Sequence, residues 1–467
     1  MTLFYILLGI YLVLALIIVL SLLVNGVRPT KMLAWLLGVF TIPVGGILLY
    51  LVLGRNRRKK QLDKLAMPIP LHREQQPENQ KSAFPEKYRK LARLITVNCH
   101  FMPVQGNDIR YLKDGRSTFK SIFEALENAQ HYIHIEYYIF EDGALARKML
   151  RLFSRKIRQG VAVRLIYDGV GSFSLSRKYL RQLRQLGVEV YPFLPFRFGR
   201  FLTTVNYRNH RKIVVVDGRV GFTGGMNLSD KYMVGDVVLG QWHDMHLRVA
   251  GAAVAQLNQV FLRDWHLVCQ QRPELPPYPH FRSTGKSMVQ VVHNGPDDSF
   301  PAIEHTYFSI ITTAQDYLYI TNPYIIPGQS VLTALETAAL GGVEVRLLLS
   351  EKQDSRLVNW SVRSYFTTLL RAGVRIFLFS DGFLHSKVML SDDQIASIGT
   401  ANIDVRSFEH NYEVNTVIYD AQFVTALRKD FLQDCMQSSE LTYTEHEKRP
   451  WGHRVKEGFA KVFSPLL

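Results

Sequence analysis

Cysteine is scarce in this chain of 467 residues, which contains only Cys99, Cys269 and Cys435. Three cysteines so widely separated are not typical of a disulfide framework, and their spacing matches neither a metal site nor a redox pair. We therefore expect buried free thiols in a reducing compartment. The histidines His243 and His246 alternate with other residues on a strand-like segment, so we expect one exposed and one supporting side chain there and predict no metal site.

Acidic residues are also outnumbered, at 40 against 56 basic residues, and the net charge is +16. Such an excess favours an anionic partner, either nucleic acid or acidic lipid. Charge is absent from residues 3–24, an apolar run that as a helix is about 33 Å long and crosses a bilayer core. A signal peptide is the alternative for this run, but no basic residue precedes it and it is long.

Residues 32–53 form a second apolar run, interrupted by Pro43 and by Gly45 and Gly46. We expect two N-terminal transmembrane helices, of which the second is kinked or re-entrant. Two membrane segments favour lipid over nucleic acid as the anionic partner.

The charges of the connecting segments predict an orientation. Five basic residues lie within residues 55–60, after the second run, whereas the short connection before it carries Arg28 and Lys31. Because Lys and Arg accumulate on the cytoplasmic side, we expect a multi-pass protein of the cytoplasmic (inner) membrane, with the larger part of the chain inside the cell. Residues 61–83, rich in Gln and Pro, are typical of a polar tether.

The pattern H-x-K-x4-D occurs twice in the chain. Its residues are His210, Lys212 and Asp217 in the first copy and His385, Lys387 and Asp392 in the second. The copies are 175 residues apart (385 − 210), and each is followed at the same distance by Gly and Asn, namely Gly224 and Asn227, and Gly399 and Asn402. One such match has a chance rate on the order of one in ten thousand per position, so two copies with matching neighbours indicate a shared function.

The spacing of the motif also predicts its geometry. Each copy runs along apolar residues, 213–216 and 388–390, that end at turn residues, so we expect a strand followed by a tight turn. Residues two apart on a strand share a face, which places each histidine beside its lysine. The aspartates fall at the turns, where turn chemistry or a supporting salt bridge is expected of them.

A histidine and a lysine supplied twice suit phosphoryl transfer, which needs positive charge around the phosphoryl oxygens, a nucleophile and a proton donor. One neutral imidazole attacks phosphorus to give a phosphohistidine, while the other protonates the leaving alcohol. This chemistry requires no metal and no cofactor. Carboxylates follow each motif, at Asp244 and Glu413, and a carboxylate on the far ring nitrogen fixes the tautomer of a histidine.

The repeat extends beyond the motifs. Segments that match are 132–135 with 317–320, 161–168 with 343–350, 186–188 with 372–374, and 261–264 with 431–434. Helical stretches such as 143–159 and 361–371 alternate with these strands, so each half is expected to be an α/β structure with a mixed sheet. Two halves that face each other bring both motifs to one central cleft. We therefore predict a membrane anchor at 1–60, the tether at 61–83, two halves at 84–285 and 286–445, and a C-terminal helix at 446–467.

In these residues the chain resembles the phospholipase D superfamily, whose members carry paired H-x-K-x4-D motifs and use a phosphohistidine mechanism. The resemblance extends from about residue 84 to about residue 441 and, in segments 135–140, 206–212, 382–385 and 399–408, is closest to bacterial cardiolipin synthases. It implies that two phosphatidylglycerol molecules give cardiolipin and glycerol. It also implies a catalytic set made of both motifs, with His210 as the nucleophile, and a phosphate-binding or supporting set of Asn227, Asn402, Asp244 and Glu413.

Further candidates lie near the motifs. Glu136 and Asn322 end repeated strands, where the cleft residues of α/β sheets gather, and either contacts the substrate or only makes strand-end hydrogen bonds. Arg208 belongs to segment 193–211, in which Phe and Arg alternate as at a membrane interface, with a solvated loop as the alternative. Residues 451–467 predict a basic amphipathic helix that lies on the membrane or caps the domain.

Three functions of different classes fit these features. The first is a membrane transphosphatidylase that acts on anionic phospholipid, phosphatidylglycerol and cardiolipin, with no nucleic acid as partner. The second is a phosphodiesterase of the same fold that uses water as acceptor, and the third is an inactive lipid-binding scaffold. Two intact motifs argue against the scaffold. The oligomeric state is left open, a homodimer included.

Overall fold

The computed structural model describes residues 2–24, 29–51, 84–195, 207–275 and 285–464. The chain divides into two compact units, one N-terminal and helical, the other built of helices and strands, which we call the helical unit and the α/β unit. The tether predicted at 61–83 and the basic cluster at 55–60 lie outside the described residues, as does most of the Phe- and Arg-rich segment, 196–206.

The helical unit contains α1 (Thr2–Val24), α2 (Pro29–Thr41) and α3 (Pro43–Leu49). Among the described residues only α1 is long and apolar enough to cross a membrane. The kink predicted in the second run is confirmed, because α2 ends at Thr41 and Pro43 opens α3, as expected of a proline that cannot continue a helix. Within the described residues the second run is therefore divided into two short helices.

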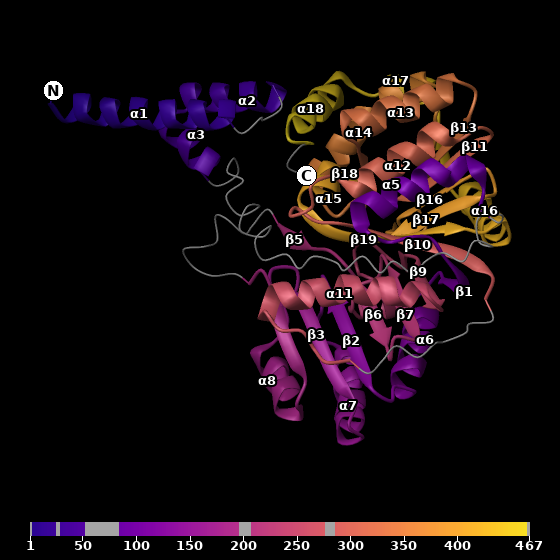
Figure 1. Ribbon diagram of the computed structural model, residues 1–467. Coiled ribbons are helices and arrows are strands. Elements are labelled where there is room, and N and C mark those ends of the chain that lie inside the picture. Colours follow the sequence, from indigo (N-terminus) through magenta and orange to yellow (C-terminus); the bar gives the residue numbers. More distant parts are fainter. Residues whose placement is uncertain (1, 25–28, 52–83, 196–206, 276–284, 465–467) are drawn as a thin grey trace. The chain divides into compact units, whose positions relative to one another are not determined.

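The α/β unit is organised around a long mixed sheet that passes through both halves of the repeat (Figure 1). The strands of the first half are β1 (Val104–Leu112), β2 (Tyr132–Tyr137), β3 (Ala162–Asp168), β4 (Glu189–Phe193), β5 (Arg208–Asn209), β6 (Ile213–Val216), β7 (Val220–Gly224), β8 (Trp242–His243) and β9 (His246–Ala250). Those of the second half are β10 (Ser287–Asn294), β11 (Tyr317–Asn322), β12 (Ile325–Ile326), β13 (Glu344–Ser350), β14 (Arg375–Phe379), β15 (Phe383–Leu384), β16 (Val388–Ser391), β17 (Ile395–Gly399), β18 (Ile403–Asp404), β19 (Asn411–Tyr419) and β20 (Ser439–Leu441).

The strand order shows the duplication directly. It runs β9-β7-β6-β2-β3-β4 in the first half and β19-β17-β16-β11-β13-β14 in the second, and the antiparallel pair β1 and β10 joins the two series. The predicted repeat partners fall on equivalent strands, 132–135 on β2 and 317–320 on β11. The prediction of a duplicated α/β fold with mixed sheets is confirmed.

Helices cover the sheet of each half. They are α6 (Gly115–Glu127), α7 (Ala144–Arg158), α8 (Arg177–Leu186), α10 (Lys231–Val234) and α11 (Ala253–Cys269) in the first half, and α12 (Ala302–Thr313), α13 (Gln329–Leu340), α14 (Arg356–Arg371), α15 (Val405–Glu409), α16 (Ala421–Met436), α17 (Tyr443–Glu447) and α18 (Trp451–Val462) in the second. A 3-10 turn (Glu86–Tyr88) leads into α5 (Arg89–Cys99), which packs on α12 and β10 of the second half although it lies at the start of the first half in sequence. Side-chain caps such as Ser176 before α8 and Asp420 before α16 fix where helices begin.

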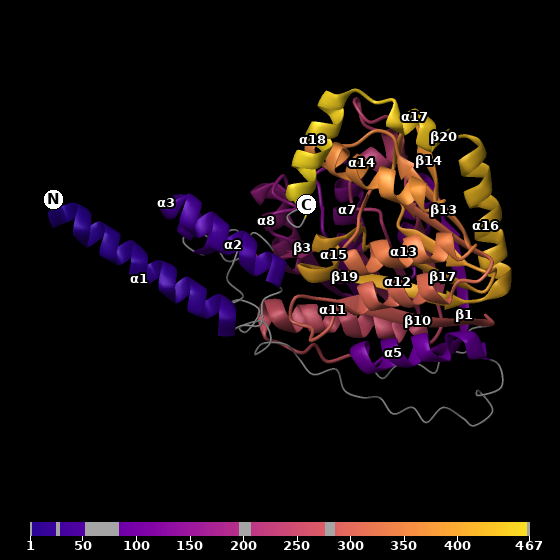
Figure 2. The ribbon, with the colours of Figure 1, turned by 90° about the horizontal axis from the view of Figure 1, so that it is seen from above.

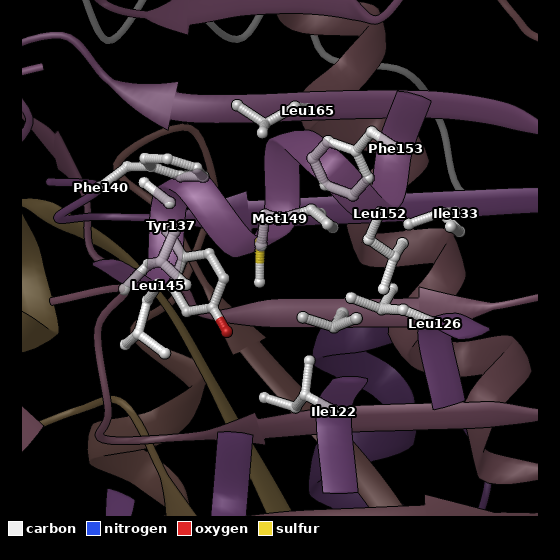
Figure 3. Packing of buried hydrophobic residues seen from close by; sticks show 14 of the residues in the cluster. Ile122, Leu126, Ile133, Tyr137, Phe140, Leu145, Met149, Leu152, Phe153 and Leu165 are labelled. Carbon is white, nitrogen blue, oxygen red and sulfur yellow. The ribbon is translucent and has the colours of Figure 1, made fainter. Parts of the chain in front are cut away.

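The core of the first half shows why the strands form where they do. Figure 3 shows side chains of α6 and α7, among them Ile122, Leu126 and Met149, packed against Ile133 of β2 and Leu165 of β3. Strands buried on both faces are expected to be continuously apolar, and residues 213–216 of β6 are all buried. The chain therefore enters the hydrophobic core directly after Lys212, the lysine of the first motif.

The C-terminal helix α18 packs on α14 and leaves most of its apolar side chains exposed. Its buried residues are Glu457 and Ala460, and Glu457 accepts a hydrogen bond from Arg449 Nε at 2.8 Å. The apolar residues of the helix are exposed; they are Trp451, Val455, Phe459 and Val462. Figures 1 and 2 both place α18 and α15 at the end of the α/β unit opposite α16.

The aspartates of the two motifs organise turns. Asp217 (φ 52°) accepts hydrogen bonds from the backbone N–H groups of residues 130, 131 and 132 at 2.7–2.8 Å. Asp392 (φ 53°) does the same for residues 315, 316 and 317 at 2.9–3.0 Å. Each carboxylate thus holds the beginning of the neighbouring strand, β2 or β11, at the end of β6 or β16 away from the motif's histidine and lysine. These contacts confirm the turn chemistry expected of both aspartates, whereas their assignment to the catalytic set stays a prediction.

Replacing Asp217 by Asn is expected to lower the free energy of unfolding by about 1–3 kcal/mol, because the amide NH2 faces backbone N–H donors. Asn keeps the positive φ that Asp tolerates, so the loss isolates the hydrogen bonds. Asp108→Asn is the control, since the exposed ion pairs of Asp108 with Arg110 and Arg248 contribute about 1 kcal/mol or less. Denaturant unfolding of the three proteins measures the difference, and equal midpoints for all three would contradict the assigned role.

Candidate active site

His210 is positioned by the strand before it. β5 pairs in parallel with β19, and the backbone N–H of His210 donates to the carbonyl of Tyr412 at 2.9 Å. Asp168, at the end of β3, accepts hydrogen bonds from the Asn209 N–H at 2.9 Å and from the Arg208 guanidinium at 3.1 Å. The backbone before the first motif is thus attached to both halves.

His385 is held in the same way from the opposite half. β15 pairs in parallel with β8, and the His385 N–H donates to the carbonyl of His243 at 2.7 Å. His243 therefore contributes its backbone carbonyl to the site; it lies three residues before His246, the other histidine of the strand-like segment. Within the described residues no group of three or more His, Cys, Asp or Glu side chains is arranged to hold a metal ion.

Each motif histidine is paired with a carboxylate of the other half. His210 Nδ1 lies 3.0 Å from Glu413 Oε2, and His385 Nδ1 lies 2.7 Å from Asp244 Oδ2. With the carboxylate on Nδ1, the tautomer is fixed and Nε2 carries the reactive position. Neither Nε2 has a hydrogen-bond partner among the described residues, and the two side chains keep exposed fractions of 12% and 15%.

The carboxylates are themselves fixed. Thr400 and Asn411 donate hydrogen bonds to Glu413, with 2.5 Å and 3.1 Å separations. Asp244 lies so close to Gly225 that an added Cβ there would meet its Oδ1 at 2.0 Å, so glycine is required at that position. Burial raises the pKa of Glu413, but the nearby His210 and Lys212 outweigh it and the net pKa is lowered. The pKa of Asp244 is likewise lowered, because the effect of His385 and Lys387 outweighs that of burial.

The two lysines are buried beside the histidines. Lys212 Nζ donates to the carbonyl of His210 at 2.6 Å, and Lys387 Nζ donates to that of His385. Burial lowers the pKa of Lys212 to about 7 and that of Lys387 to about 8, against partial compensation by Glu413 and Asp244. The site is therefore short of negative charge, which an anionic ligand would supply.

Burial also lowers the pKa of both histidines. For His385 the pKa falls to about 4, with Lys387 and Lys212 adding to the effect of burial and Asp244 opposing it. For His210 the pKa is likewise lowered, with Lys212 and Lys387 contributing. Lysines of both halves act on each histidine, so the two motifs share one electrostatic environment. At neutral pH both imidazoles are neutral.

The motif asparagines are largely buried. Asn227 accepts a hydrogen bond from the Ile139 N–H at 3.1 Å, and its amide lies 3.5 Å from the Tyr232 hydroxyl. Asn402 donates to the Tyr324 hydroxyl at 2.8 Å, while its Oδ1 is buried without a partner among the described residues. The preceding glycine, Gly224, has a φ of +151° and no room for a Cβ beside the β9 backbone.

Of the three candidates for substrate contact, Glu136 and Arg208 bind other protein groups. Glu136 is fully buried and accepts a hydrogen bond from Asn209 Nδ2, and burial raises its pKa well above the usual value. Arg208 is buried in its ion pair with Asp168. Asn322 is buried too, and its Oδ1 has no hydrogen-bond partner in the described structure.

Several site residues were not predicted. The ring of Tyr138 meets that of His210 edge to face at 4.8 Å, and the Tyr232 hydroxyl lies 3.4 Å from His385 Nδ1. Arg211 is fully buried and bridges the halves, donating to the carbonyls of Glu413 and Asn294 at 3.1 and 3.0 Å. The sequence contains one signal for Tyr138. It lies 186 residues before Tyr324 (324 − 138), which is also the offset between the repeated segments 186–188 and 372–374.

The chain is similar to known proteins over nearly its whole length. A family model described as "Cardiolipin synthase, PLD-like domain" matches residues 122–265 and 307–435, and one described as "Phospholipase_D-nuclease N-terminal" matches residues 10–55. The cardiolipin synthase of Geobacillus kaustophilus is 40% identical over 457 residues, which covers 94% of this chain and 89% of the relative. Cardiolipin synthase 2 of Bacillus anthracis is 40% identical over 453 residues, with coverages of 94% and 87%.

A solved structure shares the fold. Phosphatidylserine synthase from Haemophilus influenzae superposes with a TM-score of 0.62 at 15% identity and covers 81% of this chain and 100% of its own. At that identity the likeness supports the duplicated architecture alone.

Binding of a dianion that does not itself titrate, such as sulfate, is expected to draw protons into the site near pH 8. The anion raises the pKa of Lys212 and Lys387 from about 7 and about 8, so protons are taken up where the free lysines are partly neutral, and affinity falls as pH rises. Calorimetry in buffers of different ionisation enthalpy measures the uptake. Lys387→Arg keeps a permanent charge and should show less uptake; equal uptake in this variant would contradict the assignment.

Proposed function

Because the chain belongs to the cardiolipin synthase family of the phospholipase D superfamily, we propose that it is a phosphatidyltransferase that joins two phosphatidylglycerol molecules into cardiolipin and releases glycerol. The observation that carries this proposal is the exchange of carboxylates between the halves, Glu413 to His210 and Asp244 to His385. It supplies two oriented imidazoles to one reaction centre, which a transfer with separate nucleophile and acid requires.

In the first step, Nε2 of neutral His210 attacks the phosphorus of one phosphatidylglycerol. The bond between phosphorus and the glycerol head-group oxygen breaks, and His385 delivers the Nε2 proton to that oxygen, so that glycerol leaves and a phosphatidyl-histidine remains. Glu413 stabilises the positive charge that develops on His210. The choice of His210 as nucleophile follows the superfamily.

In the second step, the same groups work in reverse. Nε2 of His385, now neutral, takes the proton from the head-group hydroxyl of a second phosphatidylglycerol. The alkoxide oxygen attacks phosphorus, the bond between phosphorus and His210 breaks, and cardiolipin is released with both imidazoles restored.

The first step needs a protonated His385, although its pKa in the free site is about 4. A phosphodiester between Lys212 and Lys387 offsets the positive charge that depresses this pKa, so binding of substrate itself favours protonation. The lysines, with Asn227 and Asn402, stabilise the phosphoryl oxygens. Asn322 is the remaining candidate for a head-group contact, while Glu136 and Arg208 position the backbone before His210.

We also propose how the chain is arranged at the membrane. Residues 1–60 anchor it with α1 crossing and the broken second run re-entering or crossing, 61–83 are the tether, and the halves at 84–285 and 286–445 face one cleft on the cytoplasmic side. The anchor places the protein in the cytoplasmic membrane. The apolar stripe of α18, flanked by Arg454, Lys456 and Lys461, suits an anionic lipid surface.

Purified protein in phosphatidylglycerol vesicles is expected to form cardiolipin and glycerol in equal amounts. His210→Ala should lower the rate by about 10³-fold or more, since it removes the nucleophile. Chromatography of the lipids and assay of glycerol measure both products, and Asp217→Asn, scaled to its folded fraction, is the control that keeps the reacting groups.

Two outcomes would redirect this proposal. Phosphatidic acid without cardiolipin would mean that water is the acceptor and that the enzyme is a membrane phosphodiesterase. Trapping with phosphatidylglycerol labelled in its phosphatidyl part, followed by peptide mapping, should find label on His210; label on His385 would reverse the roles of the histidines.

The C-terminus is expected on the cytoplasmic side. Fusion of alkaline phosphatase, which is active only outside the cytoplasm, to residue 467 should give an inactive reporter, whereas a fluorescent protein at the same position should fold. An active phosphatase fusion would overturn the orientation predicted from the basic residues at 55–60.

A further inference from the structure

The loop between β3 and α8 carries an exposed aromatic residue at its tip and is held by hydrogen bonds to site residues. Asp168 Oδ1 accepts hydrogen bonds from the N–H groups of Val170 and Gly171 at 2.9 and 2.8 Å. Ser172 Oγ donates to the carbonyl of Tyr138 at 2.9 Å. At the tip, Phe173 is 87% exposed.

This loop lies directly on Tyr138, the residue whose ring contacts His210. A Cβ added at Gly171 would meet the Tyr138 ring at 2.6 Å, so no side chain fits between loop and ring. Asp168 also binds the backbone before His210. The position of Phe173 is therefore coupled through short contacts to the first histidine.

A second exposed apolar tip lies in the connection between α10 and β8. Residues 236 and 240 exchange two backbone hydrogen bonds, at 2.8 and 2.9 Å, and Asp236 Oδ1 accepts the N–H groups of Val238 and Leu239 at 2.9 and 3.1 Å. This closed turn holds Val237 and Val238 outward, with exposed fractions of 104% and 80%. Val234, just before it, is 75% exposed.

Both stems of this turn touch the second histidine. Tyr232, in α10, has its hydroxyl 3.4 Å from His385 Nδ1. Trp242, in β8, has its ring 5.3 Å from that of His385. Each motif histidine is thus accompanied by an ordered loop with an apolar tip. We call the tip residues the apolar rim; they are Val170, Phe173, Val234, Val237 and Val238.

Exposed apolar residues scattered singly over a surface are ordinary. The rim residues differ because they are gathered on two loops that hydrogen bonds hold in shape. The rim side chains themselves are exposed and add little apolar burial to the folded chain, so they point to an external apolar partner.

The chemistry of the substrate identifies that partner. A phospholipid brings its phosphate to the histidines while its acyl chains stay in the bilayer, so residues beside the histidines meet the lipid surface. The net charge of +16 attracts an anionic surface and repels a second copy of this chain. The chain also carries α1, which is long and apolar enough to cross a membrane.

We propose that the apolar rim inserts into the surface of an anionic phospholipid bilayer and thereby applies the active site to the head groups. This inference rests on the proposed function and deepens it. Phe173 accompanies His210, and the valines accompany His385, so both reacting groups are presented to lipid together. The rim acts by positioning the enzyme, and its residues take no part in the reaction at phosphorus.

The test compares two forms of one substrate. In the full-length enzyme, Val237→Glu with Val238→Glu, and separately Phe173→Glu, should lower turnover of phosphatidylglycerol vesicles by about tenfold or more, because a charged side chain resists entering lipid. Turnover of monomeric short-chain phosphatidylglycerol should stay near wild type, which also shows that the variants fold. Leu340→Glu is the matched control, since Leu340 is 73% exposed at the end of α13 that leads to the start of β13, away from the histidines.

A second measurement reports contact directly. A polarity-sensitive fluorophore on Val238→Cys, in a chain whose three native cysteines are replaced by serine, should shift to the blue in vesicles containing phosphatidylglycerol. The same label on Leu340→Cys should not shift.

The outcomes separate the two proposals. Wild-type vesicle activity retained by the glutamate variants, without a fluorescence shift at position 238, would overturn the rim. A shift that appears in detergent and rises with protein concentration would assign the rim to a second copy instead. Absence of cardiolipin from the wild type would overturn the proposed function while the fluorescence shift still tested the rim.

Discussion

The site depends on the hydrogen bond that each motif histidine makes to a carboxylate of the opposite half. Neither motif histidine makes this pair within its own half, because Glu413 serves His210 and Asp244 serves His385. The halves must consequently be held in one register, and several features do so. β1 pairs with β10, β5 pairs with β19, and β8 pairs with β15. Buried Arg211, the middle residue of the first motif, donates to backbone carbonyls of the second half.

This arrangement concentrates positive charge where the protein itself supplies little compensation. Two lysines and two histidines share the centre, and burial depresses the pKa of all four. Burying such groups opposes folding. Within the described residues, Glu413 and Asp244 hydrogen-bond to the histidines, whereas each lysine donates to a backbone carbonyl. In the proposed mechanism, a phosphodiester contributes the missing negative charge. Substrate binding is then coupled to the protonation of His385, and the same imidazole is acid in the first step and base in the second.

Much of this could be predicted from the sequence, and the failures have physical causes. The period of a strand placed each histidine beside its lysine, and the repeat predicted two α/β halves. The pairing between halves could not be predicted, because a constant offset identifies equivalent positions and not which copy touches which. Asp217 and Asp392 share the motif with the histidines, yet a strand lies between them, and at about 3.3 Å per residue its four residues carry the aspartate to the opposite end. Glu136 and Arg208 were candidates for substrate contact, and in the structure both are buried and paired with other protein groups.

Rigidity also links the chemistry to the lipid. An enzyme whose substrate stays in a bilayer must order the reacting groups before it meets the substrate, because a head group is attacked only within the depth that the lipid allows. Asp168 contributes to both requirements, since one carboxylate binds the backbone before His210 and the loop that carries Phe173. On the other side, Tyr232 and Trp242 touch His385 and support the turn that carries Val237 and Val238. Because few and short contacts join these tips to the histidines, lipid that displaced the tips would displace the histidines too. Loops held in shape by hydrogen bonds therefore preserve the geometry that Glu413 and Asp244 give the two histidines.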